Sequence, residues 1–133
     1  LALSLPETTA RRAMFVSHQM PGVQVFDGVR YSPGWIGAAL SYKYLAQQAL
    51  AAQWPQLEVM EDDVLFLPDY VEHKAVVDAY LAQRSGQWDV FVGLIAIMHP
   101  DTRVLGVERQ GGLVCCGLAP GLALQCGLGL RRA

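Results

Sequence analysis

The residues best suited to chemistry are three consecutive carboxylates, Glu61, Asp62 and Asp63, which interrupt an apolar run on both sides. Six of the twelve acidic residues of the chain lie between Glu58 and Glu72. Holding such charges at the edge of a core is costly unless a cation or hydrogen bonds compensate them. Mg²⁺ and Mn²⁺ suit this role, because they take carboxylate oxygens together with substrate phosphates. The alternative is an acidic helix start that complements the helix dipole. The pattern alone leaves both interpretations open.

Short apolar runs around this acidic triplet (Glu61, Asp62 and Asp63) predict strands. They cover residues 1–5, 23–26, 57–60 and 89–98, and the last strand is expected to be fully buried. Stretches with helical signals separate them. This alternation indicates the α/β class, with a mostly parallel sheet that carries helices on both faces. Ligands bind outside the carboxyl ends of the strands in such sheets, and the triplet falls at one of those ends.

The predicted helices begin at recognisable signals. The segment Ser4-Leu5-Pro6-Glu7 has capping-box spacing, which puts Pro6 at the first helical position. The second helix begins after Ser32-Pro33-Gly34. Its buried face is expected to carry Ile36, Leu40 and Tyr44, which repeat every four residues. The predicted spans are 6–20, 35–53 and 68–84.

Composition excludes several classes of protein. The 133 residues suit one ordinary domain, and 53% hydrophobic against 17% charged residues excludes disorder. A net charge of −2 argues against nucleic acid as a partner. The three cysteines have no zinc-ligand spacing, which favours reduced thiols and a cytoplasmic location. Leu1 already lies in an apolar run with no signal peptide before it, so we expect the chain to begin inside its first element.

The segment from Gln110 to Leu130 differs from the rest. It has no charged residue, but it holds six of the thirteen glycines and all three cysteines. Neither helical nor strand periodicity is visible, so we assign no element there. We therefore predict a domain over residues 1–109 and an atypical tail over 110–133. A membrane-spanning helix flanked by Arg131 and Arg132 is the less favoured alternative, because glycine and proline make poor helices. An out-of-frame coding sequence is a further alternative.

Three segments, in order, resemble glycosyltransferase family 25, the lipopolysaccharide and lipooligosaccharide galactosyltransferase-like enzymes. Residues 3–12 (Leu-Ser-Leu-Pro-Glu-Thr-Thr-Ala-Arg-Arg) are similar to the family's opening strand, Leu-Pro turn and arginines. Residues 34–42 (Gly-Trp-Ile-Gly-Ala-Ala-Leu-Ser-Tyr) resemble its Gly-x-x-Gly-x-x-Leu-Ser-His segment. Residues 60–64 (Met-Glu-Asp-Asp-Val) are similar to its Leu-Glu-Asp-Asp-Val, the family's form of the DxD metal motif. The similarity ends near Met98, as in a truncated member.

This resemblance implies a GT-A-like (Rossmann-like) fold with an incomplete C-terminal half. It also implies a cytoplasmic glycosyltransferase of lipopolysaccharide biosynthesis. Such an enzyme transfers a hexose, such as galactose, from a UDP-sugar to a saccharide acceptor, with metal assistance and inversion at the anomeric centre. Association with the membrane surface is conceivable but has no support in the pattern.

The resemblance also implies roles for individual residues that match the family's motifs. Glu61 and Asp63 become ligands of Mn²⁺ or Mg²⁺. Four residues are expected to bind the nucleotide-sugar: Arg11, Arg12, Ser41 and Asp62. Two of them have a structural alternative, because Ser41 also suits packing within a helix and Arg12 also suits a solvated helix face. No catalytic base is assigned, because the family's second half is not recognisable after Met98. Tyr42 stands where the family has histidine.

Two other hypotheses stay open. One is a truncated remnant that binds nucleotide and metal without turnover, and the other is an unrelated α/β domain with an acidic helix start. A response-regulator receiver is excluded, because the strand at 90–97 contains no carboxylate and no lysine follows Lys74. Asp27 suits a turn, with a ribose contact as the alternative. We expect the histidines (His18, His73 and His99) to be exposed polar or loop residues, with metal contact as the alternative for His99. The tryptophans are expected to be packing residues; they are Trp35, Trp54 and Trp88.

Overall fold

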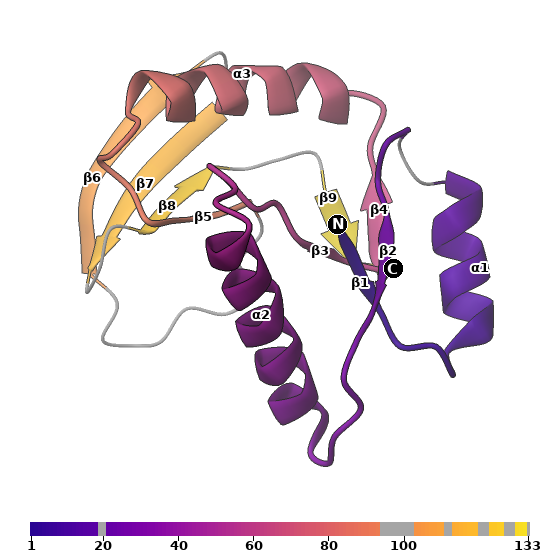
Figure 1. The fold of residues 1–133 in the computed structure, drawn as a ribbon. Helices are drawn as coiled ribbons and strands as arrows, with labels where there is room; N and C mark the ends of the chain where they lie inside the picture. Colours follow the sequence, from indigo (N-terminus) through magenta and orange to yellow (C-terminus); the bar gives the residue numbers. More distant parts are fainter. Residues whose placement is uncertain (19–20, 94–102, 111–112, 120–122, 127–129, 133) are drawn as a thin grey trace. The chain divides into compact units, whose positions relative to one another are not determined.

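The computed structural model describes residues 1–18, 21–93, 103–110, 113–119, 123–126 and 130–132. They form a mixed α/β structure that divides into two compact units (Figure 1). Unit 1 comprises Leu1–Leu65 and Arg132–Ala133, and unit 2 comprises Phe66–Arg131. Each unit is described by itself below.

Unit 1 contains a three-stranded parallel sheet in the order β2-β1-β3. Its strands are β1 (Ala2–Ser4), β2 (Val25–Asp27) and β3 (Met60–Glu61). The central Leu3 is paired with Phe26 on one side and with Glu61 on the other. All three carboxyl ends therefore lie at one edge, and the acidic triplet is there. The prediction of a parallel sheet with the triplet at a strand end is confirmed, but the strand predicted at 57–60 was wrong over residues 57–59, since β3 begins at Met60 and includes Glu61.

The first helix, α1 (Thr9–His18), begins later than the capping-box spacing predicted. That prediction was wrong because Ser4 is the last residue of β1, and its Oγ donates a hydrogen bond to Asp62. Ser4 is therefore not available as a cap. The first helical hydrogen bond runs instead from the N–H of Arg12 to the carbonyl of Thr8 at 2.9 Å. Figure 1 shows α1 and α2 on opposite sides of the sheet.

The second helix, α2 (Gly34–Ala51), begins where predicted but buries a different face. Leu40 and Tyr44 are 40% and 47% exposed, so they do not form the buried face that their spacing predicted. The buried residues lie one position further along each turn: Gly37, Ser41, Leu45 and Ala49. A Cβ built on Gly37 would lie 2.3 Å from the carbonyl oxygen of Val29, so only glycine permits this approach of backbone to helix. The contact at Gly37 sets which face is buried.

Unit 2 is built around α3 (Tyr70–Gln83), whose bounds agree with the predicted third helix. Val77, Tyr80 and Leu81 form its buried cluster, against which Trp88 and Phe91 pack. Desolvation by burial raises the pKa of the Tyr80 hydroxyl above its usual value.

Unit 2 also contains a second sheet. Its strands are β5 (Val90–Val92), β6 (Arg103–Gln110), β7 (Leu113–Ala119) and β8 (Ala123–Cys126). Their order in the sheet is β5-β8-β7-β6. β8 pairs with β5 in parallel and with β7 in antiparallel orientation, and β6 and β7 are antiparallel. The strand predicted at 89–98 is described only over β5, and Val90 in it is 56% exposed, so the expectation of full burial was wrong there. Residues 94–98 of that prediction lie outside the described residues.

Regular structure extends into the segment after residue 110, to which we had assigned no element. Besides β7 and β8, it contains β9 (Leu130–Arg132), which pairs with β4 (Val64–Phe66). Within the described ranges, no helix is both long and apolar enough to cross a membrane.

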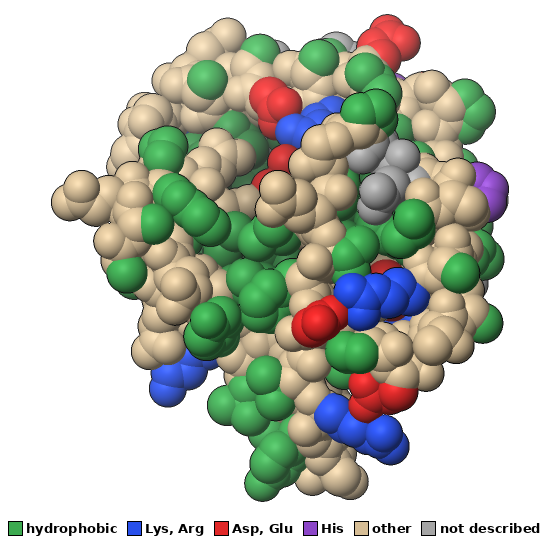
Figure 2. Space-filling model, turned by 45° about the vertical axis from the view of Figure 1, so that its right-hand side comes forward, with side chains coloured by type: hydrophobic (Ala, Val, Ile, Leu, Met, Phe, Trp, Pro, Cys, Tyr) green, Lys and Arg blue, Asp and Glu red, His purple; other side chains and the backbone are tan. Residues whose placement is uncertain are grey.

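Many large hydrophobic side chains are exposed, among them Trp35 and Leu50. Figure 2 shows hydrophobic side chains gathered on the face in view, with acidic and basic side chains next to one another.

Candidate functional site

A cavity of about 150 Å³ opens at the carboxyl edge of the parallel sheet. Its walls come from the end of β1, the segment 28–31, the first turns of α2, Arg11 of α1 and the acidic triplet. All of these residues belong to unit 1. The fold therefore brings the triplet together with a guanidinium and with the start of a helix, although these elements lie far apart in the sequence.

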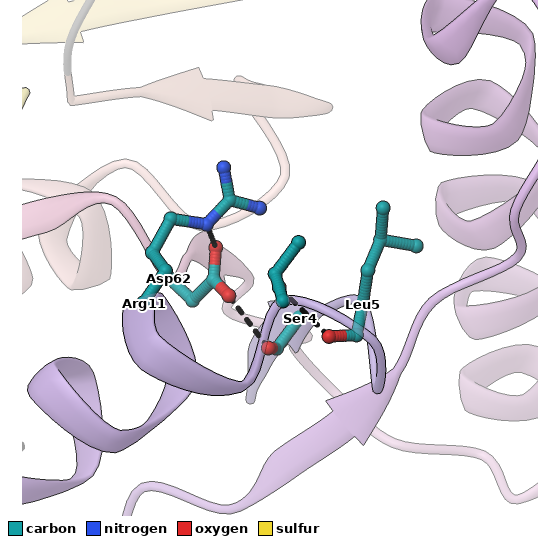
Figure 3. Close-up of polar contacts among 5 residues, drawn as sticks. Ser4, Leu5, Arg11 and Asp62 are labelled. Carbon is teal, nitrogen blue, oxygen red and sulfur yellow. Dashed lines mark hydrogen bonds and ion pairs between the residues drawn. The ribbon is translucent and has the colours of Figure 1, made fainter.

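Asp62 lies at the base of this arrangement and is only 2% exposed. Its Oδ2 accepts a hydrogen bond of 2.5 Å from the Ser4 hydroxyl, and its Oδ1 lies 2.8 Å from Nε of Arg11 (Figure 3). Its backbone N–H donates to the carbonyl of Leu3 at 3.1 Å, next to the pairing of β1 with β3. Both carboxylate oxygens are thus held by the protein, and the buried charge of Asp62 is compensated within unit 1.

The two neighbouring arginines have different positions. Arg11 pairs with Asp62 and lines the cavity. Arg12 pairs through Nη2 with Oδ1 of Asp27 at 2.7 Å and is not part of the cavity wall. Asp27, which was predicted in a turn, is the last residue of β2 instead. Of the two arginines expected at a nucleotide-sugar, the structure brings only Arg11 to the cavity.

Ser41 is a buried wall residue that connects α2 to the segment before it. Its hydroxyl accepts a hydrogen bond from the N–H of Val29 and donates one to the carbonyl of Gly37, both at 2.8 Å. Its hydroxyl proton is therefore already used inside the protein. This geometry matches the packing alternative for Ser41 and makes the residue a fixed part of the wall.

We expect Ser41→Ala to lower the free energy of unfolding by about 1–3 kcal/mol, because it leaves the part-buried N–H of Val29 without its acceptor. Urea denaturation followed by circular dichroism measures the change. Ser17→Ala is the matched control, since the Ser17 hydroxyl is exposed and bonds to Met14 and His18 within α1. Equal losses in the two variants would contradict the role of Ser41.

Glu61 and Asp63 also line the cavity, and both are half-buried. The hydroxyl of Tyr42, at the position of the family's histidine, donates to Oε1 of Glu61 at 3.3 Å. Asp63 has no hydrogen-bond or ion-pair partner among the residues that the structure describes. It is therefore the carboxylate of the triplet most available to a ligand.

The donor set at the cavity suits a hard cation that arrives together with phosphate. Across the described ranges, no group of three or more His, Cys, Asp or Glu side chains is arranged to hold a metal. Glu61 and Asp63 can supply two carboxylates, and Mg²⁺ usually takes one or two carboxylates plus substrate phosphates. The residues present fit a cation that the protein and a diphosphate hold jointly.

None of the other candidate residues that the structure describes lines the cavity. His18 contacts Ser17 and the carbonyl of Met14 at the end of α1. His73 is in α3, with its Nδ1 3.7 Å from Asp69. His99 lies outside the described residues. Among the tryptophans, Trp35 and Trp54 are exposed, whereas Trp88 donates to the carbonyl of Leu81.

Comparison with known proteins finds no relative of this chain: no family model, curated protein or solved structure matches it. Any assignment of function therefore rests on the residues and the geometry of the site.

Proposed function

We propose that the cavity binds a UDP-sugar together with Mn²⁺ or Mg²⁺, and that the protein is a glycosyltransferase of GT-A-like fold. It transfers a hexose to a saccharide acceptor. One observation carries the proposal: Asp63 and Glu61 share a cavity with the guanidinium of Arg11 at the carboxyl edge of a parallel sheet. Carboxylates, a cation and a guanidinium together match the charges of a diphosphate, and α/β sheets bind ligands at this edge.

Each group has a distinct part in this proposal. Glu61 and Asp63 hold the cation, which neutralises charge on the departing diphosphate. The planar guanidinium of Arg11 suits phosphate oxygens. Gly34, the first residue of α2, also lines the cavity, and the N-terminus of a helix favours anions.

A second candidate is a protein that binds the nucleotide and the cation without turnover. It is favoured by Tyr42, whose hydroxyl contacts Glu61 at the position where the family has histidine. Histidine is the most frequent general base in enzymes, and Tyr42 provides no imidazole at this position. The two candidates share the binding site and differ only in the transfer reaction.

Calorimetric titration with UDP, with and without Mn²⁺, tests the binding site. We expect Mn²⁺ to be required for tight binding, and Asp63→Asn to weaken Mn²⁺-dependent binding at least about tenfold, a loss of about 1.4 kcal/mol. Asp89→Asn is the control, since Asp89 is exposed and lies outside the cavity. It should leave the affinity unchanged.

The outcomes separate the candidates. Release of hexose from a UDP-sugar to a saccharide or to water supports the transferase, and Mn²⁺-dependent binding without release supports the second candidate. A folded protein that binds no UDP under either condition would contradict both. It would leave the unrelated α/β domain, in which the acidic triplet is structural.

A further inference from the structure

We propose that Asp62 is a positioning residue. It holds Arg11 so that the two terminal nitrogens of the guanidinium face a phosphate group in the cavity, and it does not itself bind the cation. This inference rests on the proposed function in one respect, that a nucleoside diphosphate occupies the cavity. It assigns the middle carboxylate of the triplet a role different from that of its neighbours.

The contacts of Asp62 support this role. One carboxylate oxygen accepts from Ser4 and the other pairs with Arg11, while the backbone N–H is bonded to Leu3. The residue is 2% exposed, so its side chain has no freedom to turn toward a ligand. A carboxylate with both oxygens engaged and no exposed surface is a poor cation ligand. The same carboxylate is a rigid acceptor for an arginine.

The way in which Arg11 is held leaves its phosphate-binding groups free. Its ion pair with Asp62 joins Nε to the carboxylate, and its side chain is 44% exposed. Figure 3 shows Nε turned toward Asp62 and the two terminal nitrogens turned away from the carboxylate. These nitrogens carry the paired donors that bind phosphate oxygens. Arg12 differs, because a terminal nitrogen of its guanidinium is bound to Asp27.

A long arginine side chain loses rotamer freedom when it binds a ligand. Arg11 has lost much of that freedom already, because Asp62 fixes its Nε and Ser4 fixes Asp62. Preorganisation of this kind raises affinity without adding a contact. A negative charge beside an anion site would by itself weaken anion binding. Removal of Asp62 can therefore lower phosphate affinity only through the lost orientation of Arg11. The positioning role predicts a lower affinity on removal of Asp62, whereas the loss of its charge alone would raise the affinity.

Calorimetric titration of the whole chain with inorganic pyrophosphate, without metal, isolates this interaction. Arg11→Gln and Asp62→Ala should each lower the affinity at least about tenfold, as expected for a charge-assisted hydrogen bond. Asp62→Asn should stay within about threefold of the wild type, because its amide oxygen can take the place of the carboxylate oxygen next to Nε and its NH₂ can donate to Ser4. Arg12→Gln is the matched control on the same helix and should change the affinity less than about twofold.

The pyrophosphate affinity of the double variant Arg11→Gln with Asp62→Ala distinguishes a positioning role of Asp62 from a merely structural one. If Asp62 acts through Arg11, the double variant binds pyrophosphate no more weakly than Arg11→Gln alone. Additive losses would overturn the proposal, as would an Asp62→Ala variant that binds as tightly as the wild type. If Asp62→Ala does not fold, the Nε–H signal of ¹⁵N-labelled Arg11 in the wild type gives the answer. That proton must exchange slowly with water, and its signal must shift with pyrophosphate; fast exchange would overturn the proposal.

Titration with UDP and Mn²⁺ separates failure of this inference from failure of the proposed function. Mn²⁺-dependent UDP binding that is insensitive to Arg11→Gln would overturn the role of Arg11 and Asp62 and leave the proposed function standing. Pyrophosphate binding with the expected coupling, but without Mn²⁺-dependent UDP binding, would support the inference and contradict the proposed function.

Discussion

Gly37→Ala should destabilise the protein by about 3 kcal/mol or more, which is a large part of the stability of an ordinary domain. The added Cβ would lie 2.3 Å from the carbonyl oxygen of Val29 and 3.0 Å from the backbone nitrogen of Tyr31. Both atoms belong to the backbone, and that segment is held by the bond from the Val29 N–H to Ser41. Neither side of the contact can yield without breaking other interactions.

Gly34→Ala is the matched control, because the same substitution in the same helix meets nothing within 4 Å. We expect no loss there, and a gain of up to about 1 kcal/mol from the reduced entropy of the unfolded chain. Urea denaturation of both variants, followed by far-ultraviolet circular dichroism, measures the difference. Similar midpoints would show that the segment 29–31 does not lie against α2 as described.

The second large effect concerns the cation. UDP should tighten the binding of Mn²⁺ by about 100-fold, and Mn²⁺ should tighten UDP by the same factor, because coupling between two ligands is reciprocal. On the proposed function, Glu61 and Asp63 alone would be too few to hold the ion firmly, and across the described part of the chain no larger group of metal-binding side chains is present. The phosphate oxygens of UDP would complete the coordination.

Electron paramagnetic resonance of free Mn²⁺ measures this coupling, after subtraction of the Mn²⁺ that UDP binds in solution. Uridine is the control ligand, since it lacks the diphosphate and should leave Mn²⁺ affinity unchanged. Tight Mn²⁺ binding in the absence of nucleotide would contradict the prediction. It would show that the protein provides a complete metal site.

The parts of the fold that could be predicted are those set by local sequence. The alternation of apolar runs and helix signals placed β1, β2 and three helices, and put the acidic triplet at a strand end, but of the strand predicted at 57–60 only Met60 belongs to β3. The start of α2 followed from Ser32-Pro33-Gly34 in the same way. Signals of this kind depend on a few neighbouring residues, and they do not require knowledge of what lies across the molecule.

The parts that could not be predicted depend on distant partners. Ser4 had the spacing of a cap, but its hydroxyl bonds to Asp62, 58 residues away in the sequence. The predicted buried face of α2 was wrong because the spacing of hydrophobic residues such as Leu40 and Tyr44 indicates an apolar face, whereas the close contact at Gly37 decides which face is buried. A glycine inside a helix costs about 1 kcal/mol, so Gly37 was itself a sign of a close contact.

The antiparallel pairing of β6 with β7 also has a local signal in the sequence. Two glycines, Gly111 and Gly112, separate Gln110 from Leu113, and a Gly-Gly pair of this kind is typical of two-residue hairpin loops. The observed register, in which Gln110 pairs with Leu113, agrees with that signal. Strand periodicity in this segment is obscured by its many apolar and glycine residues.

The small volume of the cavity limits how much of a ligand the protein can enclose. About 150 Å³ is below the roughly 300–1,000 Å³ of most small-molecule sites. A UDP-sugar would therefore place its diphosphate inside and leave its base and hexose on the open surface, where Tyr31 borders the cavity and is 53% exposed. Selectivity for base and sugar would then belong to exposed side chains. These could change in evolution or by design without disturbing Asp62 and Arg11, which the proposal places at the phosphate.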